Sequence, residues 1–116
     1  MYSGLFSIIV PVYNRPDEVR ELMESLSRQT DRGFEIVIVE DGSTITCKAE
    51  AEAYAPLVAL QYFYKENEGR SPARNYGMDH ARGDYFVFVD SDCILPPDYI
   101  ASLREACLLY PSDAAD

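Results

Sequence analysis

Short apolar runs alternate along the chain with stretches in which apolar residues recur every three or four positions. The runs are rich in β-branched and aromatic residues and end at polar or glycine-containing turns, which is typical of buried strands. Strands are expected over residues 6–10, 36–39, 60–64 and 85–89. The periodic stretches predict amphipathic helices from Pro16, over 46–54 and 72–81, and from Pro97.

Prolines mark several of these boundaries. Pro11 is expected to close the first strand, whereas Pro16 and Pro97 open helices, because proline is tolerated in a first helical turn. One face of the first helix and one face of the last helix are expected to be buried. The members of these faces are Val19, Leu22, Met23 and Leu26 in the first helix, and Ile100, Leu103, Cys107 and Leu108 in the last.

The alternation of strands and helices predicts an α/β fold. Crossover helices join parallel neighbours, so we expect a mostly parallel open sheet with helices on both faces, in a Rossmann-like arrangement. A length of 116 residues suffices for one domain with its own core. In such a sheet the strand ends share one edge, where ligands bind. Three polar turns should therefore meet there, at 13–14, 40–43 and 90–92.

The strongest candidate chemistry follows the strand at 85–89, which we interpret as buried. Asp90 and Asp92 are two residues apart, so in an extended segment both side chains project to the same side. Two neighbouring carboxylates call for a cation, and oxygen ligation by few protein groups favours Mg²⁺ or Mn²⁺ completed by phosphate oxygens. The alternative is an ordinary strand end followed by helix-starting acids.

Two further segments carry candidate binding residues. Asp41 follows an apolar strand, and its carboxylate could accept a base N–H or a ribose hydroxyl; a plain turn or helix cap is the alternative. Arg70 and Arg74 lie at a helix start, where guanidinium groups suit phosphate; exposed arginines on an ordinary helix are the alternative. His80 has no catalytic partner at a useful spacing and is interpreted as structural or exposed.

Composition narrows the class of partner and the compartment. Twenty acidic residues against ten basic ones argue against a nucleic-acid-binding face. Cys47, Cys93 and Cys107 are widely spaced, which fits core residues in a reducing compartment better than a disulfide framework or a zinc site. Because no apolar run approaches the ~20 residues of a membrane span, we expect the chain to be soluble and cytoplasmic. The absence of Walker and Gly-x-Gly-x-x-Gly motifs weakens NTPase and dinucleotide-binding interpretations.

Four segments, in this order and at these intervals, resemble the N-terminal half of an inverting family 2 glycosyltransferase with the GT-A nucleotide-sugar fold. They run from Ser7 to Asn14, from Ile36 to Thr44, from Asn67 to Gly69 together with Ala73 to Gly77, and from Gly83 to Asp92. Each segment is weak alone, but the ordered set is specific and covers nearly the whole chain. The resemblance implies one nucleotide-sugar-binding domain over 1–116, belonging to a longer enzyme.

The resemblance also implies roles for individual residues. The turn from Pro11 to Tyr13 would flank the nucleotide base, and Asp41 would bind that base. Asp90 and Asp92 would form an Asp-x-Asp motif, with Asp92 as the metal ligand and Asp90 close to ribose, sugar or metal-bound water.

Arg74 would assist the loop or the diphosphate. Two departures from the family pattern matter here. Glu40 stands where the family often has a first aspartate, which leaves the second carboxylate in place. The family's catalytic base, an Asp or Glu, follows the metal motif at a greater distance, so we expect it beyond Asp116.

The implied activity is metal-dependent, inverting transfer of a hexose from a UDP-type donor to a hydroxyl of a saccharide or lipid-linked acceptor, in polysaccharide biosynthesis. Peripheral attachment to the cytoplasmic face of a membrane and homo-oligomers at an unpaired sheet edge stay open. A signalling receiver domain would need acids where Pro11 to Tyr13 stands, and a nucleotidyltransferase would need a glycine-rich basic loop at 14–16. The remaining alternative is a catalytically incomplete binding or assembly module.

Overall fold

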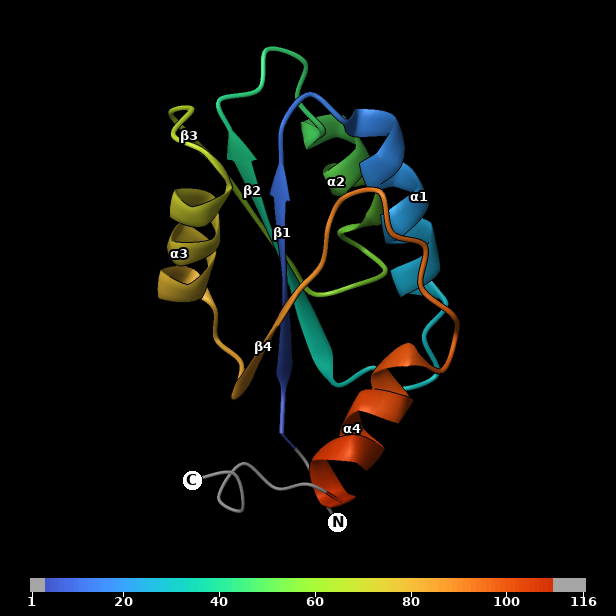
Figure 1. Ribbon diagram of the computed structural model, residues 1–116. Helices are drawn as coiled ribbons and strands as arrows, with labels where there is room; N and C mark the ends of the chain where they lie inside the picture. Colours follow the sequence, from blue (N-terminus) through green and yellow to red (C-terminus); the bar gives the residue numbers. More distant parts are fainter. Residues whose placement is uncertain (1–3, 110–116) are drawn as a thin grey trace.

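The computed structural model describes residues 4–109, in which strands and helices alternate throughout (Figure 1). The elements are β1 (Phe6–Val12), α1 (Pro16–Ser27), β2 (Phe34–Asp41), α2 (Lys48–Tyr54), β3 (Leu60–Lys65), α3 (Arg70–His80), β4 (Tyr85–Phe88) and α4 (Tyr99–Leu109). The strands form one sheet in the order β3-β2-β1-β4, and every neighbouring pair is parallel. The predicted α/β fold with an open parallel sheet is confirmed.

Helices cover both faces of the sheet, as the sequence predicts. α1 and α2 lie together on one face, while α3 packs on the other face against β1 and β2 (Figure 1). α4 lies near the end at which the strands begin. None of the helices in the described part is long and apolar enough to cross a membrane.

The two central strands are buried on both sides, because successive side chains of a strand point to opposite faces. The larger core lies on the α1 and α2 side. It includes Ile8, Val10, Ile36 and Ile38 from the strands and Val19, Leu22, Met23 and Leu26 from α1. On the other side, Ile9, Val37 and Val39 pack against Ala73 of α3. Each buried aliphatic side chain contributes about 1.5–3 kcal/mol, so this packing holds the strand ends in place.

β1 continues through Pro11 to Val12, so the prediction that Pro11 closes the strand is wrong. The carbonyl of Ile9 accepts a hydrogen bond from the backbone N–H of Val89, so the backbone polar groups of Ile9 face β4. The direction of these groups repeats every two residues along a strand, so the backbone of Pro11 faces the same side. The ladder with β4 ends at Ile9. Proline therefore occupies a position where no ladder donor is required.

β4 is only half covered, which corrects the interpretation of this strand as buried. Tyr85 and Val87 pack against the larger core, but Phe86 and Phe88 are 44% and 43% exposed. The reason is topological. β4 is an edge strand, and α3 packs mainly against β1 and β2 on that face.

Other element boundaries differ from prediction by one or two residues. β2 gains two residues at each end, because residues from Phe34 to Asp41 all pair with β1 or β3. α3 begins at Arg70, two residues before Pro72, since proline is tolerated in the first turn. α2 and α4 begin two residues later than predicted, and β4 ends one residue earlier.

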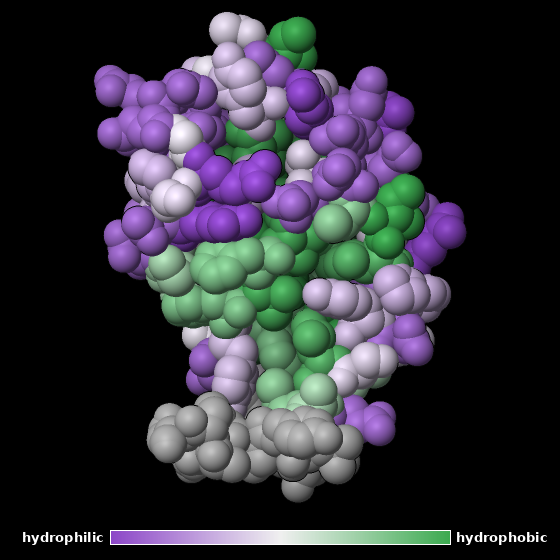
Figure 2. Space-filling model, in the orientation of Figure 1, coloured by the Kyte–Doolittle hydropathy of each residue, from purple (hydrophilic) through white to green (hydrophobic). Residues whose placement is uncertain are grey.

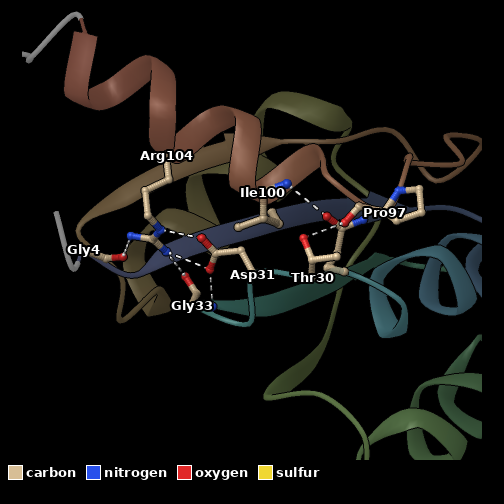
Figure 3. Close-up of polar contacts among 8 residues, drawn as sticks. Gly4, Thr30, Asp31, Gly33, Pro97, Ile100 and Arg104 are labelled. Atoms are coloured by element: carbon tan, nitrogen blue, oxygen red, sulfur yellow. Dashed lines mark hydrogen bonds and ion pairs between the residues drawn. The ribbon is translucent and has the colours of Figure 1, made fainter. Parts of the chain in front are cut away.

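α4 is fastened to the start of the sheet by Arg104 (Figure 3). Its Nε donates to Asp31 at 2.6 Å, and its Nη1 donates to the carbonyl of Gly4, also at 2.6 Å. Ile100 of the same helix is fully buried, while Leu103 and Cys107 pack partly buried against the core, as predicted. The side chain of Leu108, which was predicted to share this face, lies outside the described residues.

The cysteines are free thiols, as expected. Cys47 is fully buried in the larger core, and Cys93 and Cys107 pack partly buried against it. His80 is exposed; its ring stacks on Tyr76 with centroids 4.3 Å apart, which agrees with a structural or exposed histidine.

Candidate functional site

A cleft of about 500 Å³ opens at the end of the sheet where the strands finish. Its lining comes from the ends of β1, β2 and β4, from the first turn of α1 and from the loop between β3 and α3. The lining residues are Pro11, Val12, Tyr13, Arg15, Glu18, Asp41, Asn67, Gly69, Arg70, Asp90, Ser91 and Asp92. Figure 2 shows hydrophilic residues gathered over this upper end and apolar residues below them. The predicted meeting of Asp41 with Asp90 and Asp92 in one cleft is confirmed.

The end of β1 provides one wall. Tyr13 is 51% exposed, and Pro11 also lines the cleft. The next residue, Asn14, takes a left-handed backbone conformation (φ 53°), and its Oδ1 accepts hydrogen bonds from the backbone of Thr44 (2.8 Å) and Ile45 (3.0 Å). The turn after β1 is thus tied to the turn after β2.

The two acids at the end of β2 point to opposite faces, because neighbouring side chains alternate. Glu40 is fully buried on the α2 side, where it accepts hydrogen bonds from the Ser43 hydroxyl (2.5 Å), the Cys47 backbone (2.5 Å) and the Tyr62 hydroxyl (3.0 Å). Burial and the Glu40 carboxylate raise the pKa of both the Cys47 thiol and the Tyr62 hydroxyl. Glu40 therefore shapes the turn from within and does not face the cleft.

Asp41 faces the cleft and the loop before α3, and it is only 6% exposed. Its two carboxylate oxygens accept hydrogen bonds from the backbone N–H groups of Glu68 (2.9 Å) and Gly69 (3.0 Å). The Nζ atom of Lys65 lies 3.8 Å from Oδ1. This carboxylate is thus already engaged by the protein.

The end of β4 carries the most open acids. The Asp90 side chain is 51% exposed, and its Oδ1 lies 4.0 Å from Nη1 of Arg70 and 3.9 Å from Nη2 of Arg74. Asp92 is exposed. Between them, the Ser91 hydroxyl donates to Glu18 of α1 at 3.0 Å. The contacts of Asp90 are long, so its oxygens have capacity for a further partner.

Arg74 does not line the cleft, although the sequence places it among the binding residues. Its guanidinium carbon lies 5.5 Å from the centre of the Phe88 ring, on the exposed face of β4. Its Nε is buried without a hydrogen-bond partner. Arg74 therefore reaches the site through Asp90, and Arg70 is the arginine of α3 that faces the cleft.

The donor set of Asp90 and Asp92 fits a hard divalent cation that is shared with a ligand. Both carboxylates line the cleft and are open to solvent. Within residues 4–109, no three His, Cys, Asp or Glu side chains converge into a closed metal cage. Mg²⁺ typically binds through one or two carboxylates together with substrate phosphates, and two open carboxylates match that pattern.

Three residues of the site were not singled out from the sequence. Lys65 ends β3 at the same edge of the sheet, so the rule that found Asp41 and Asp90 could have found it. Glu18 and Arg15 lie at the start of α1, where the positive end of the helix dipole is enough to explain an acid such as Glu18. Their place in the cleft depends on the tertiary fold and leaves no local signal.

The sequence profile of the glycosyl transferase family 2 matches residues 7–115. The chain belongs to this family. GlyA, a glycosyltransferase of Streptococcus pneumoniae, is 38% identical over 110 residues, which are 94% of this chain and 16% of GlyA. YibD, an uncharacterized glycosyltransferase of Escherichia coli, is 40% identical over 116 residues, covering 97% of this chain and 33% of YibD. The chain thus spans a third or less of these relatives.

Solved structures of glycosyltransferases have the same fold. TarS from S. aureus superimposes with a TM-score of 0.85 at 30% identity, over 91% of this chain and 33% of the TarS chain. TarS has also been solved with UDP and with UDP-GlcNAc. The mannosyltransferase PcManGT from Pyrobaculum calidifontis, solved with GDP-Man and Mn²⁺, gives a TM-score of 0.80 at 29% identity, over 87% of this chain and 31% of its own. The GT-A fold expected from the sequence is confirmed.

Proposed function

We propose that this chain forms the donor-binding part of an enzyme that transfers a sugar from a UDP-sugar to a hydroxyl group. The observation that carries the proposal is the single cleft that gathers Tyr13, Asp41, Arg70, Asp90 and Asp92 at the ends of the parallel strands. Family 2 membership supports the reaction class. The UDP-GlcNAc complex of TarS supports the donor class.

The cleft divides into two chemical regions. Tyr13 and Pro11 offer an aromatic and an apolar surface for a nucleotide base. Asp90 and Asp92 follow β4, the neighbour of β1 in the sheet, and we assign them to a divalent cation, Mg²⁺ or Mn²⁺. When bound, the cation would supply positive charge for the leaving diphosphate. Arg70, with Arg74 behind Asp90, would add cationic groups that orient the phosphates.

We propose the acceptor, the stereochemistry and the base of the reaction on the ground of family membership. The acceptor hydroxyl would attack the anomeric carbon from the side opposite the diphosphate, so that the new glycosidic bond forms with inversion as the bond to the phosphate oxygen breaks. The hydroxyl proton would pass to a carboxylate base. The acceptor would be a saccharide or lipid-linked hydroxyl, and the whole enzyme would work in the cytoplasm or at its membrane face.

Metal-dependent nucleotide binding tests this proposal. We expect UDP with Mn²⁺ to raise the melting temperature of the 116-residue chain, and UDP to bind at least about tenfold more tightly than GDP in calorimetry. Asp92→Asn should abolish the metal dependence, whereas Asp98→Asn, an exposed acid that does not line the cleft, should leave it intact. Absence of any shift with Mn²⁺ and UDP would overturn the assignment.

The same titration addresses the alternative of a binding or assembly module. Such a module would bind UDP-sugar in this cleft without transferring the sugar. Sugar release or transfer that is lost in Asp92→Asn would separate the enzyme from the module.

A further inference from the structure

The carboxylate of Asp41 is occupied by the loop that joins β3 to α3. The backbone N–H groups of Glu68 and Gly69 each donate to one of its two oxygens, and the Asn67 side chain donates to the Asp41 carbonyl at 2.8 Å. Successive N–H groups that converge in this way form an anion-binding nest. Because the acceptor is charged, these hydrogen bonds are stronger than neutral ones.

Two neighbours hold the same loop from other sides. The Nζ atom of Lys65 donates to the Glu66 carbonyl at 2.8 Å and to the Glu68 carboxylate at 2.5 Å. Gly42 faces Asn67 so closely that a Cβ atom at position 42 would lie 2.6 Å from the Asn67 nitrogen. The backbone φ of Gly42 is also +72°, which side chains disfavour. Loop and strand end are therefore fitted to each other.

The loop carries part of the cleft. Asn67 and Gly69 line it, and Arg70 follows directly as the first residue of α3. The nest thus fixes the residue immediately before Arg70, whose Nη1 atom lies 4.0 Å from Oδ1 of Asp90.

We infer that Asp41 is a positioning residue for the phosphate end of the donor. Its carboxylate holds loop 67–69 against β2, and this sets the place of Arg70 in the cleft. The inference rests on the proposed function of the cleft, and it differs from a direct contact between Asp41 and the base. A direct reader of the base would matter only for ligands that have a base. A positioning residue for Arg70 also matters for a bare diphosphate.

Inorganic pyrophosphate with Mn²⁺ separates the two roles. Asp41→Asn keeps the size of the side chain but replaces one accepting oxygen by a donor that opposes a backbone N–H. We expect calorimetry on the 116-residue chain to show about a tenfold weaker affinity for both pyrophosphate and UDP. Weakened UDP binding with unchanged pyrophosphate binding would overturn the inference in favour of a base contact.

Asp84→Asn is the matched control, because Asp84 also accepts a backbone N–H, from Leu5 at 2.8 Å, but at the opposite end of the sheet. It should leave both affinities unchanged. A loss equal to that of Asp41→Asn would show that the effect is general destabilisation, which also overturns the inference.

Gly42→Ala provides a second route that leaves the carboxylate intact. The added methyl group would displace the loop at Asn67, so both affinities should fall as in Asp41→Asn. This variant also carries the test if Asp41→Asn does not fold. Wild-type affinities in a folded Gly42→Ala would show that the position of the loop does not govern binding.

The path through Arg70 is tested by a double variant. If Asp41 acts by placing Arg70, Asp41→Asn combined with Arg70→Gln should weaken pyrophosphate binding about as much as the stronger single variant. Losses that multiply would contradict this path. Hydrogen exchange at the Glu68 and Gly69 amides should accelerate in Asp41→Asn without any ligand. That readout tests the loop contact even if the wild-type chain binds no nucleotide, in which case the proposed function fails separately.

Discussion

The two ends of the sheet treat their polar groups in opposite ways. At the end where the strands begin, Ser7 and Glu35 are buried and bonded to each other at 2.6 Å. At the end where the strands finish, Asp90 is half exposed and its nearest cations are 3.9 and 4.0 Å away. Both ends belong to the same strands, in which side chains alternate between the two faces. The difference therefore lies in the hydrogen-bond and ion-pair partners of the polar side chains at each end.

At the beginning of the strands, the protein supplies the partners itself. Glu35 accepts hydrogen bonds from Ser7, from Gln61 at 3.0 Å and from the backbone of Arg82 at 2.6 Å. Arg104 pairs with Asp31 close by, and both side chains are less than one-fifth exposed. Groups satisfied in this way add to the stability of the fold and have no capacity for a ligand.

At the finish of the strands, solvent supplies most of the partners. Tyr13, Asp90 and Asp92 have substantial exposure and lie around one cleft. Their removal should therefore cost little folding free energy and much ligand affinity, while removal of the groups at the other end should do the reverse. Asp41 is the exception, since it lies in the cleft but, like Glu35, is buried and accepts hydrogen bonds from the protein itself.

The largest effect on stability is expected from Arg104→Met. It leaves Asp31 partly buried beside Gly33 without its cation and should lower the free energy of unfolding by about 3 kcal/mol. Urea unfolding followed by circular dichroism measures the change. Arg28→Met removes an exposed pair with Glu24 and should cost far less. Equal losses in the two variants would show that burial of the Asp31 pair is unimportant.

Ser7→Ala should have the next largest effect. The Ser7 hydroxyl donates to Glu35 and accepts from the backbone of Gly83 at 2.9 Å. Its loss therefore removes the acceptor of the Gly83 N–H and one of the three hydrogen bonds of the buried Glu35 carboxylate. We expect about 2 kcal/mol of destabilisation in the same unfolding measurement. Ser27→Ala, whose hydroxyl bonds to the carbonyl of Glu24 in its own helix, is the control and should change stability by under about 0.5 kcal/mol.

A pH series sharpens this result. Burial of Glu35 raises its pKa, but the hydrogen bonds from Ser7, Arg82 and Gln61 outweigh burial and leave the pKa below its ordinary value of 4.5. A lowered pKa in the folded state gives stability that is present above pH 4.5 and is lost as the pH falls through the folded value. The stability gap between wild type and Ser7→Ala should therefore narrow below pH 4.5. A gap that stays constant to pH 3 would contradict the role assigned to Glu35.

The same contrast explains what the sequence could and could not predict. The apolar runs around Ile8 and Ile38 have strong local signals, so the order of strands and helices and the meeting of Asp41 with Asp92 followed from pattern alone. The exposed face of β4 did not, because Phe86 and Phe88 look like core residues until the sheet order makes β4 an edge. The prediction that Pro11 ends β1 failed for a similar reason. Only the pairing of β1 with its neighbouring strands shows on which side a backbone N–H is not needed.

The individual carboxylates were harder to predict than the site as a whole. Glu40 and Asp41 are neighbours in sequence, and the sequence pattern predicts only that both belong to one acidic turn. Alternation sends Glu40 into the core beneath α2 and Asp41 to the cleft. Glu40 accepts a hydrogen bond from the Cys47 backbone, and Asp41 accepts one from the Gly69 backbone. Both donors lie in loops, whose course has no periodic signal in the sequence.

The smallest effect on stability, and the sharpest test of the contrast, is expected from Asp90→Asn. The carboxylate is half exposed and its ion pairs with Arg70 and Arg74 are long, so removing its charge should change the free energy of unfolding by less than about 0.5 kcal/mol. The same change should weaken Mn²⁺-dependent UDP binding, because it removes one of two charged oxygen donors from the cleft. Ser7→Ala should show the opposite pair of results. If Asp90→Asn destabilised the chain as much as Ser7→Ala does, the acids at this end would stabilise the fold. Their exposure would then no longer support a ligand-binding cleft.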